Sequence, residues 1–262
     1  MTSRSSASHR SRAQRAAGAL AASSRRERLP LILRQLDRTY GRPAHARGGD
    51  PLDSLIGTVL SQNTTDVNSH RTFDRLKERF PKWESVLAAR PSQIAGAIRS
   101  GGLGDIKSRR IKQILREIER DRGELDLSFL RRASVPAGRE YLTALPGVGP
   151  KTAACVLLFS LGKPAFPVDT HVLRVSKRLG LLPTKTTMEQ AHGIFEAMLD
   201  SAGPGRKAQW DADDMLALHL GLVRHGREIC AARRPRCEIC PLLDLCPRSG
   251  VDGATGKARQ YA

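Results

Sequence analysis

Four cysteines crowd the C-terminal part of a chain that is otherwise almost free of them. They are Cys230, Cys237, Cys240 and Cys246, spaced C-x6-C-x2-C-x5-C, whereas the fifth, Cys155, stands alone in an apolar segment. Such a group in a long, cysteine-poor chain is not the disulfide framework of a small secreted domain. Four thiolates suit a zinc ion or an iron–sulfur cluster. Zinc ribbons usually present two C-x2-C knuckles and this segment has one, so the spacing favours a cubane [4Fe-4S] cluster over zinc.

The loop between the first two of these cysteines carries three arginines, Arg233, Arg234 and Arg236. A bound metal would hold this loop rigid, and that arrangement suits contacts with phosphate better than core packing. The remaining cysteine, Cys155, is expected to be an inert core residue.

Apolar residues recur with helical spacing along most of the chain. Asp50-Pro51 predicts a helix start, because an acidic N-cap and a proline at the first helical position both favour one. The stripe from Leu52 to Leu60 then follows the i, i+3, i+4, i+7, i+8 pattern of a core-facing helix. Thr186 and Glu189 have the spacing of a capping box. Further helices are expected over residues 31–40, 67–80, 83–88, 111–122, 139–144, 152–161, 170–179, 188–199 and 211–224. Because no segment shows sustained period-two alternation, the sequence predicts an all-α fold.

Positive charge dominates the composition. The chain has 44 Lys+Arg against 26 Asp+Glu, a net charge of +18, which favours a polyanionic partner such as nucleic acid. Arginine outnumbers lysine 34 to 10, so an arginine-rich solvated surface remains the alternative. The longest mainly apolar stretch, residues 153–162, is too short to span a bilayer, and no secretion-signal pattern is present. A cytoplasmic protein is expected, with no membrane partner.

Both ends of the chain have compositions that cannot build a core. Residues 1–28 contain seven Arg, seven Ser and one acid, which predicts a disordered basic arm. An organelle transit peptide has the same composition, and targeting to an organelle is the minority alternative. Residues 249–262 are glycine-rich and polar, and are expected to form a flexible tail.

A glycine-rich segment, LPGVGPKT at residues 145–152, joins two short predicted helices. Its two glycines permit a tight turn and let backbone N–H groups approach a phosphate. Lys151 would lie on the first turn of the second helix, where the macrodipole opposes its positive charge. A lysine whose neutral amine is favoured in this way can act as a nucleophile. The alternative is a surface lysine that touches phosphate.

Eighteen residues further on, Asp169 precedes another predicted helix, in the segment VDTH. The helix N-terminus would stabilise its negative charge, so Asp169 is either a plain N-cap or a catalytic base. A lysine, an aspartate and a glycine turn together are far more specific than any one of them alone.

The order LPGVGPKTA, VDTHVLRV and the four-cysteine group resembles endonuclease III, of the helix-hairpin-helix DNA glycosylase superfamily. The resemblance runs from about Leu29 to Pro247. It implies two all-α domains with a DNA-binding cleft between them. One is a six-helix barrel over residues 44–163, with the helix-hairpin-helix at about 138–161. The other is an iron–sulfur cluster domain built from residues 29–43 and 164–248. The family excises oxidised pyrimidines and cleaves the strand at the resulting abasic site.

The resemblance also implies roles for single residues. Lys151 would attack C1′ of the flipped nucleotide and form a Schiff base, with Asp169 assisting, and β-elimination would then cleave the strand on the 3′ side. Gly147, Val148 and Gly149 would bind backbone phosphate through their N–H groups. The four clustered cysteines would hold a [4Fe-4S] cluster. The partner would be double-stranded DNA with damaged bases or abasic sites, bound by a monomer in the bacterial nucleoid.

A flipped base leaves a gap in the duplex that must be filled. By family position the fillers would be Leu103 and Asn63, with Gln62 as the alternative to Asn63, since the family usually has glutamine there. Two residues in the DNA-reading loops depart from the family's usual pattern. Gly104 stands where a tyrosine often follows the leucine, and Pro150 replaces a basic residue commonly found before the lysine.

Several relatives of this fold offer alternative functions. Adenine glycosylases lack the lysine and carry an extra C-terminal domain, and branches acting on G·T mismatches usually replace the lysine. An 8-oxoguanine glycosylase keeps a lysine and an aspartate but usually lacks the four cysteines. A weakly active or non-catalytic DNA-binding paralogue is the remaining alternative, and the pairing of Lys151 with Asp169 weighs against it.

Overall fold

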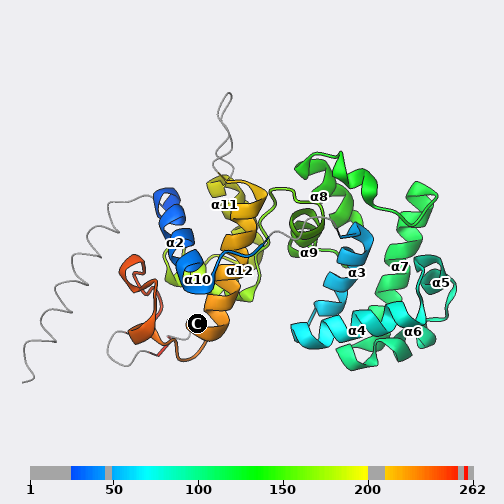
Figure 1. Cartoon of the computed structure of the whole chain (residues 1–262), viewed down its shortest axis with the longest axis horizontal. Helices are drawn as coiled ribbons and strands as arrows, with labels where there is room; N and C mark the ends of the chain where they lie inside the picture. The colour runs from blue at the N-terminus through cyan, green and yellow to red at the C-terminus, as the bar shows by residue number, and fades with distance from the viewer. Residues whose placement is uncertain (1–24, 45–48, 200–209, 253–256, 259–262) are drawn as a thin grey trace, which may run out of the picture. The chain divides into compact units, whose positions relative to one another are not determined.

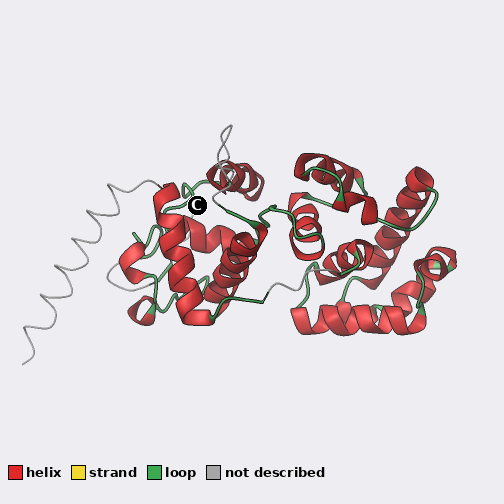
Figure 2. Cartoon of the chain, turned by 45° about the horizontal axis from the view of Figure 1, so that its top comes forward, coloured by secondary structure: helices red, strands yellow, loops and turns green. Residues whose placement is uncertain are grey.

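The computed structural model describes residues 25–44, 49–199, 210–252 and 257–258. Helices make up nearly all regular structure in these ranges, and their one β contact is an isolated antiparallel bridge between Val251 and Ala258 (Figure 2). The all-α prediction is therefore confirmed. The chain divides into two compact units (Figure 1), one over residues 46–167 and one formed by residues 1–45 with 168–262. The sequence places the junctions after residues 43 and 163, whereas in the structure they follow His45 and Pro167. None of the described helices is long and apolar enough to cross a lipid bilayer.

The unit over residues 46–167 is built around α3 (Pro51–Ser61), which packs against helices α4, α7 and α9. The predicted apolar stripe from Leu52 to Leu60 is fully buried at its five aliphatic positions, and a second stripe on α7 meets it in one core. The other elements in chain order are α4 (Asp66–Arg79), α5 (Trp83–Ala88), α6 (Pro91–Ala97), η1 (Arg99–Gly101), α7 (Gly104–Arg122), η2 (Ser128–Arg131), α8 (Val135–Ala144), α9 (Pro150–Cys155) and η3 (Val156–Ser160).

The start of α3 follows the sequence prediction. Asp50 is the N-cap, and its Oδ1 accepts hydrogen bonds from the amides of Leu52 (2.7 Å) and Asp53 (2.9 Å). Pro51 occupies the first helical position, where its missing N–H costs no hydrogen bond.

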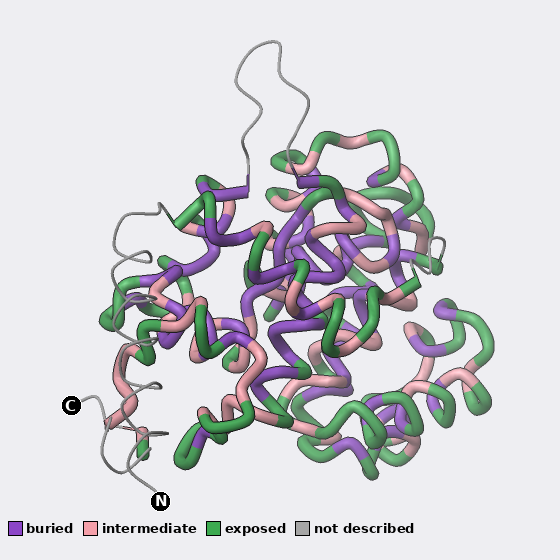
Figure 3. The backbone as a smooth tube through the Cα atoms, turned by 60° about the vertical axis from the view of Figure 1, so that its left-hand side comes forward, coloured by how far each residue is buried: buried purple, intermediate pink, exposed green. Residues whose placement is uncertain are grey.

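The other unit is built around α12 (Ala212–Glu228), which packs against both α2 (Arg25–Tyr40) and α10 (Thr170–Arg178). Gly221 allows the close contact with α2, because a Cβ at that position would lie 3.1 Å from the Cβ of Leu36. The unit also contains α11 (Met188–Leu199), η4 (Cys237–Ile239) and η5 (Leu243–Leu245). Buried and exposed positions alternate along the helices of both units (Figure 3).

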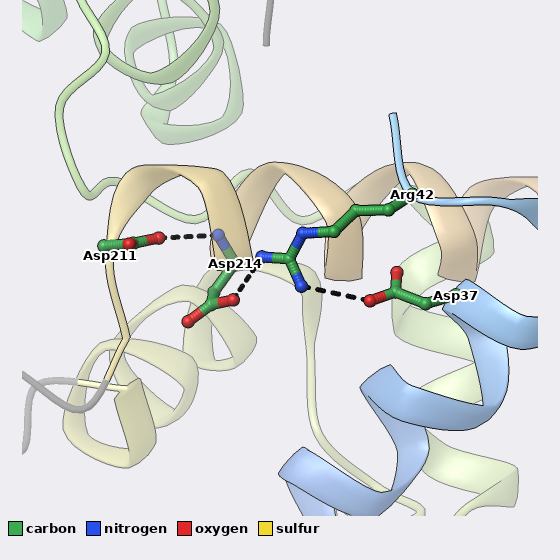
Figure 4. Close-up of polar contacts among 4 residues, drawn as sticks. All are labelled: Asp37, Arg42, Asp211 and Asp214. Atoms are coloured by element: carbon green, nitrogen blue, oxygen red, sulfur yellow. Dashed lines mark hydrogen bonds and ion pairs between the residues drawn. The ribbon is translucent and has the colours of Figure 1, made fainter. Parts of the chain in front are cut away.

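Arg42 ties the end of α2 to the start of α12 on the surface of this unit. Its guanidinium lies between Asp37 of α2, at 3.0 Å, and Asp214 of α12 (Figure 4). The amide of Asp214 in turn donates to the carboxylate of the N-cap, Asp211, at 2.8 Å. These groups are partly exposed, so we expect the ion pairs to fix geometry more than to add stability.

The predicted end of the basic arm at residue 28 is wrong. Helix α2 begins at Arg25, and Arg28 is 5% exposed. Its guanidinium donates to the carbonyls of Leu179 and Leu245, contacts that no composition argument reveals. Residues 1–24, the rest of the expected arm, lie outside the described residues.

The structure describes residues 249–252 and 257–258 of the tail that the sequence predicts to be flexible, and these residues make backbone hydrogen bonds. The amide of Ser249 donates to the carbonyl of Arg178 (3.2 Å), and the amide of Ala258 donates to the carbonyl of Arg233 (3.1 Å). Ala258 also forms an antiparallel bridge with Val251. Backbone hydrogen bonds that the polar composition does not indicate therefore join the tail to α10 and to the cysteine loop.

Two local predictions need correction. The capping box of α11 is formed by Thr187 and Gln190, one residue beyond the predicted pair Thr186 and Glu189. The segment predicted as one helix over 152–161 begins at Pro150 and widens into a π-helical turn at Val156–Ser160.

Candidate nucleic-acid site

The segment between α8 and α9 forms the tight turn that its glycines predict. Gly147 has a φ of +71°, the left-handed conformation that favours glycine, and the Val148 amide closes the turn on the carbonyl of Leu145 at 3.1 Å. The Val148 side chain is buried and anchors the hairpin in the core. Among the described residues, no acceptor meets the amides of Gly147 and Gly149. Two of the three expected amides are thus open to a ligand, and the third is used by the turn.

Lys151 lies on the first turn of α9, as predicted, and is half-buried. The four residues after it are buried, so the helix is fixed in the core behind the lysine. Its ammonium group has no hydrogen bond or ion pair with any described residue. An amine at this position is available to a ligand rather than committed to the fold.

Asp169 is the N-cap of α10, one of the two roles that the sequence predicts. Its Oδ1 accepts the amide hydrogen of Val172 at 2.7 Å, and the residue is half-buried. His171 and Arg174 follow on the same helix, and the Arg174 guanidinium lies 3.2 Å from Nδ1 of His171. Burial lowers the pKa of His171, while the Asp169 carboxylate acts in the opposite direction.

Asn63 and Leu103 share an uncommon backbone conformation. Their φ angles are +56° and +53°, a region that residues other than glycine seldom occupy. Both side chains are exposed, Leu103 by 50%. We call the segments that hold them the gap loop (62–65) and the wedge loop (101–104). In the gap loop, Gln62 is engaged by Arg110 of α7, whose Nη1 donates to Gln62 Oε1 at 2.9 Å.

A buried lysine joins these two loops. Lys107, on the first turn of α7, is 2% exposed, and its Nζ donates to the carbonyls of Leu60 (2.8 Å) and Gly101 (2.9 Å). One carbonyl lies just before the gap loop and the other begins the wedge loop. Burial lowers the pKa of Lys107, and the two carbonyls satisfy part of its hydrogen-bonding capacity. No motif in the sequence singles out Lys107 or Arg110.

The four clustered cysteines line one pocket at the end of α12, together with apolar side chains of Val175, Leu179 and Leu242. Burial raises the pKa of Cys240 to about 11 and that of Cys246 to about 12. These thiols are therefore protonated until a metal displaces the protons. Within the described ranges, no three His, Cys, Asp or Glu side chains converge closely enough to hold a single metal ion. Four thiols around one pocket supply the number of ligands that either a zinc ion or an iron–sulfur cluster takes.

Two side chains outside the cysteine pattern support this loop. Arg178 is buried, and its guanidinium donates to the carbonyls of Ala231 and Ala232, each at 2.7 Å, and to that of Cys230 at 3.2 Å. His225 lies 3.5 Å from the Cys240 sulfur through Nε2 and 2.9 Å from the hydroxyl of Tyr40 through Nδ1. Burial lowers the pKa of His225 to about 4.

The arginine loop is exposed, as expected. Arg233, Arg234 and Arg236 all lie on the surface, while Pro235 between them is buried and fixes the loop. The backbone amide of Arg236 donates to the carbonyl of Ile229 at 2.9 Å, and its guanidinium contacts the carbonyl of Glu228. The loop thus exposes three arginine side chains, while the buried Pro235 and the hydrogen bonds of Arg236 fix its backbone.

Family comparisons agree with this arrangement. Residues 56–199 match the HhH-GPD superfamily of base excision DNA repair proteins, so the chain belongs to that superfamily. Residues 230–246 match the iron–sulfur binding domain of endonuclease III. Within the superfamily, the chain is endonuclease III-like.

Individual relatives show how far the likeness extends. A provisionally named DNA glycosylase of Arabidopsis thaliana is 49% identical over 197 residues, which cover 73% of this chain and 65% of the plant protein, just under two thirds of its length. Endonuclease III of Sulfolobus acidocaldarius is 34% identical over 195 residues, 74% of this chain and 80% of that protein. The fold is similar to that in a non-covalent endonuclease III–DNA complex, with a TM-score of 0.69 and 28% identity over 86% of this chain and 96% of that one.

Proposed function

We propose that this protein is a bifunctional DNA glycosylase and abasic-site lyase that excises oxidised pyrimidines from double-stranded DNA. The observation that carries the proposal is Lys151, an amine with no partner among the described residues, beside two open amides in the hairpin. A hairpin that only binds DNA requires no more than a positive charge at position 151. A lyase requires an amine there that is available to react.

In the proposed reaction, the Lys151 amine attacks C1′ of the flipped nucleotide as the bond from C1′ to the base breaks. The sugar ring opens to give an iminium, the Schiff base. Loss of a proton from C2′ then expels the 3′ phosphate by β-elimination, and water releases the sugar fragment from the lysine. Asp169 accepts the lysine proton and stabilises positive charge that develops on the sugar.

Gap filling is assigned to Asn63 and Leu103. Gln62 is held by Arg110, whereas Asn63 is exposed, which supports Asn63 rather than its neighbour as the residue facing the orphan base. Leu103 is half-exposed in a strained backbone conformation, and such strain persists where the surrounding fold enforces it.

The four clustered cysteines are proposed to hold a [4Fe-4S] cluster, which would cross-link the loop that carries the arginines. Arg233, Arg234 and Arg236 would then contact backbone phosphates. We further propose that the protein acts as a monomer in the cytoplasm, on nucleoid DNA. None of the chemical steps above requires the cluster.

Borohydride trapping tests the assignment of Lys151. Wild-type protein incubated with abasic duplex and borohydride should form a covalent adduct, because reduction fixes the Schiff base. Lys151→Gln should bind the same duplex and form none. The control is Lys82→Gln, which removes an exposed lysine just before α5 and should leave the adduct yield unchanged. Adduct at wild-type yield from Lys151→Gln would refute the nucleophile.

The matched test of Asp169 is Asp169→Asn. Asparagine caps helices as well as aspartate does, so the bond to the Val172 amide and the fold should survive. The negative charge and the base are lost together, and single-turnover excision should slow by roughly 10²–10⁴. Excision within a few-fold of wild type would mean that Asp169 is only a cap.

A further inference from the structure

Arg110 lies where the hairpin and the gap loop meet. Its Nη1 donates to Gln62 Oε1 at 2.9 Å. A Cβ added to Gly147 would stand 2.3 Å from Nε of Arg110 and 2.7 Å from Cζ. The guanidinium therefore rests directly against the backbone of the hairpin turn. One side chain of α7 contacts two loops that are far apart in the sequence.

The charge of Arg110 is not balanced by the fold. A guanidinium keeps its charge and offers five N–H donors, and the bond to the neutral Gln62 amide uses one of them. In the part of the chain that the structure describes, no carboxylate pairs with Arg110. Arg120 on the same helix, by contrast, contacts both Glu117 and Asp121. Arg110 is thus a positioned cation with spare donors.

The neighbouring hairpin offers donors of its own. The amides of Gly147 and Gly149 have no acceptor among the described residues, and the arginine lies against the first of these glycines. A planar guanidinium fork and backbone amides are the groups that most often bind phosphate oxygens. All of these donors belong to one unit of the chain.

We propose that Arg110 binds a phosphate of the DNA backbone jointly with the amides of Gly147 and Gly149, and that Gln62 orients its guanidinium. The site rests on the proposed function, which supplies the DNA. Arg110 would also supply a positive charge next to the hairpin. The residue before Lys151 cannot do so, because it is Pro150, which has neither a charge nor an N–H.

The salt dependence of DNA binding tests this site. For wild type and Arg110→Gln, the affinity for undamaged duplex is measured over a range of salt concentrations. Each phosphate contact contributes roughly 0.9 to the magnitude of the slope of log K against log salt. Arg110→Gln should bind more weakly at low salt, with a slope shallower by about 0.9.

Two variants serve as controls. Arg116→Gln removes an equal charge from an exposed position on α7, about 120° further round the helix, and should leave the slope unchanged. Gln62→Ala should keep the wild-type slope, because the charge of Arg110 remains. If Arg110→Gln keeps the slope while Gln62→Ala reproduces its loss of affinity, Arg110 only supports the gap loop and the proposal is wrong.

A conservative variant covers the case in which Arg110→Gln loses stability. Arg110→Lys keeps the charge but not the fork, so it should retain the slope and bind with intermediate affinity. If the slope of Arg110→Lys were as shallow as that of Arg110→Gln, a contact between the charge at position 110 and a phosphate would be refuted. Borohydride trapping by the wild type is scored separately. Failed trapping with a normal slope effect refutes the lyase alone, whereas normal trapping with no slope effect refutes the Arg110 site alone.

Discussion

Gly147 and Gly123 allow a matched test of what the hairpin glycine does. Both have a left-handed φ, +71° and +74°, but Gly123 has open space where a Cβ would stand. Gly123→Ala should lower the free energy of unfolding by about 1 kcal/mol, the cost of the left-handed conformation for alanine. At Gly147 the new Cβ would also collide with Arg110. Crowding of this kind adds about 1–3 kcal/mol or displaces the arginine.

Thermal or denaturant unfolding of Gly147→Ala, Gly123→Ala and the double variant Gly147→Ala/Arg110→Ala measures the two costs. We expect the hairpin variant to lose more stability than the control, and the double variant to lose less than the sum of the single changes. Equal losses for both glycines would show that Arg110 is not held at the turn.

Residues that act within their own element could be predicted from sequence, and residues that act between elements could not. Asp50 and Asp169 are acids placed just before helical stripes, so their capping roles follow from local pattern. Lys107 lies on the same α7 stripe as Ile111 and Ile114, and a lysine in core register is the signal that was missed. Its carbonyl partners lie in other segments, so no local pattern could identify them.

At the scale of elements, periodicity located the helices better than it located their ends. The short helix Trp83–Ala88 and the longer Met188–Leu199 have the predicted bounds. Helix α2 starts at Arg25 rather than residue 31, because buried contacts of Arg28 hold a first turn that is rich in arginine. Tertiary contacts that the sequence does not display decided this boundary.

The wedge loop carries the prediction that belongs to this scale. Leu103→Ala should weaken processing of lesion-containing duplex more than binding to undamaged duplex, since only the flipped state leaves a gap to fill. Ile106→Ala is the matched control, because Ile106 is also 50% exposed and lies three residues away on α7. Binding titrations and single-turnover excision report the two effects. Equal losses on both duplexes, or the same pattern from Ile106→Ala, would mean that Leu103 only packs the loop.

At the scale of the whole molecule, the cysteine loop belongs to one of the two units, where Arg178 and His225 contact it. If its four cysteines hold a cubane, purified protein should be brown and contain about four iron and four sulfide per chain. Cys240→Ala should lose iron and lower the melting temperature, because the ligand set becomes incomplete. Cys155→Ala removes a buried cysteine of the other unit and should keep the full iron content. Stoichiometric zinc without sulfide would rule out the cluster.

The first 24 residues supply the last prediction, which concerns the search for damage rather than its chemistry. They contain four Arg and no acid, while Arg25 to Arg28 belong to α2 and must be kept in any truncation. Cations on this segment can neutralise phosphates without sequence preference, each adding roughly 0.9 to the magnitude of the salt slope. Deleting residues 1–24 should therefore flatten the slope and weaken binding to undamaged duplex at low salt. Single-turnover excision from saturated complex should stay nearly unchanged, because Lys151 and Asp169 remain. A truncated protein with the full slope and affinity would show that the segment makes no phosphate contact, and mature protein that begins near residue 25 would favour a targeting segment instead.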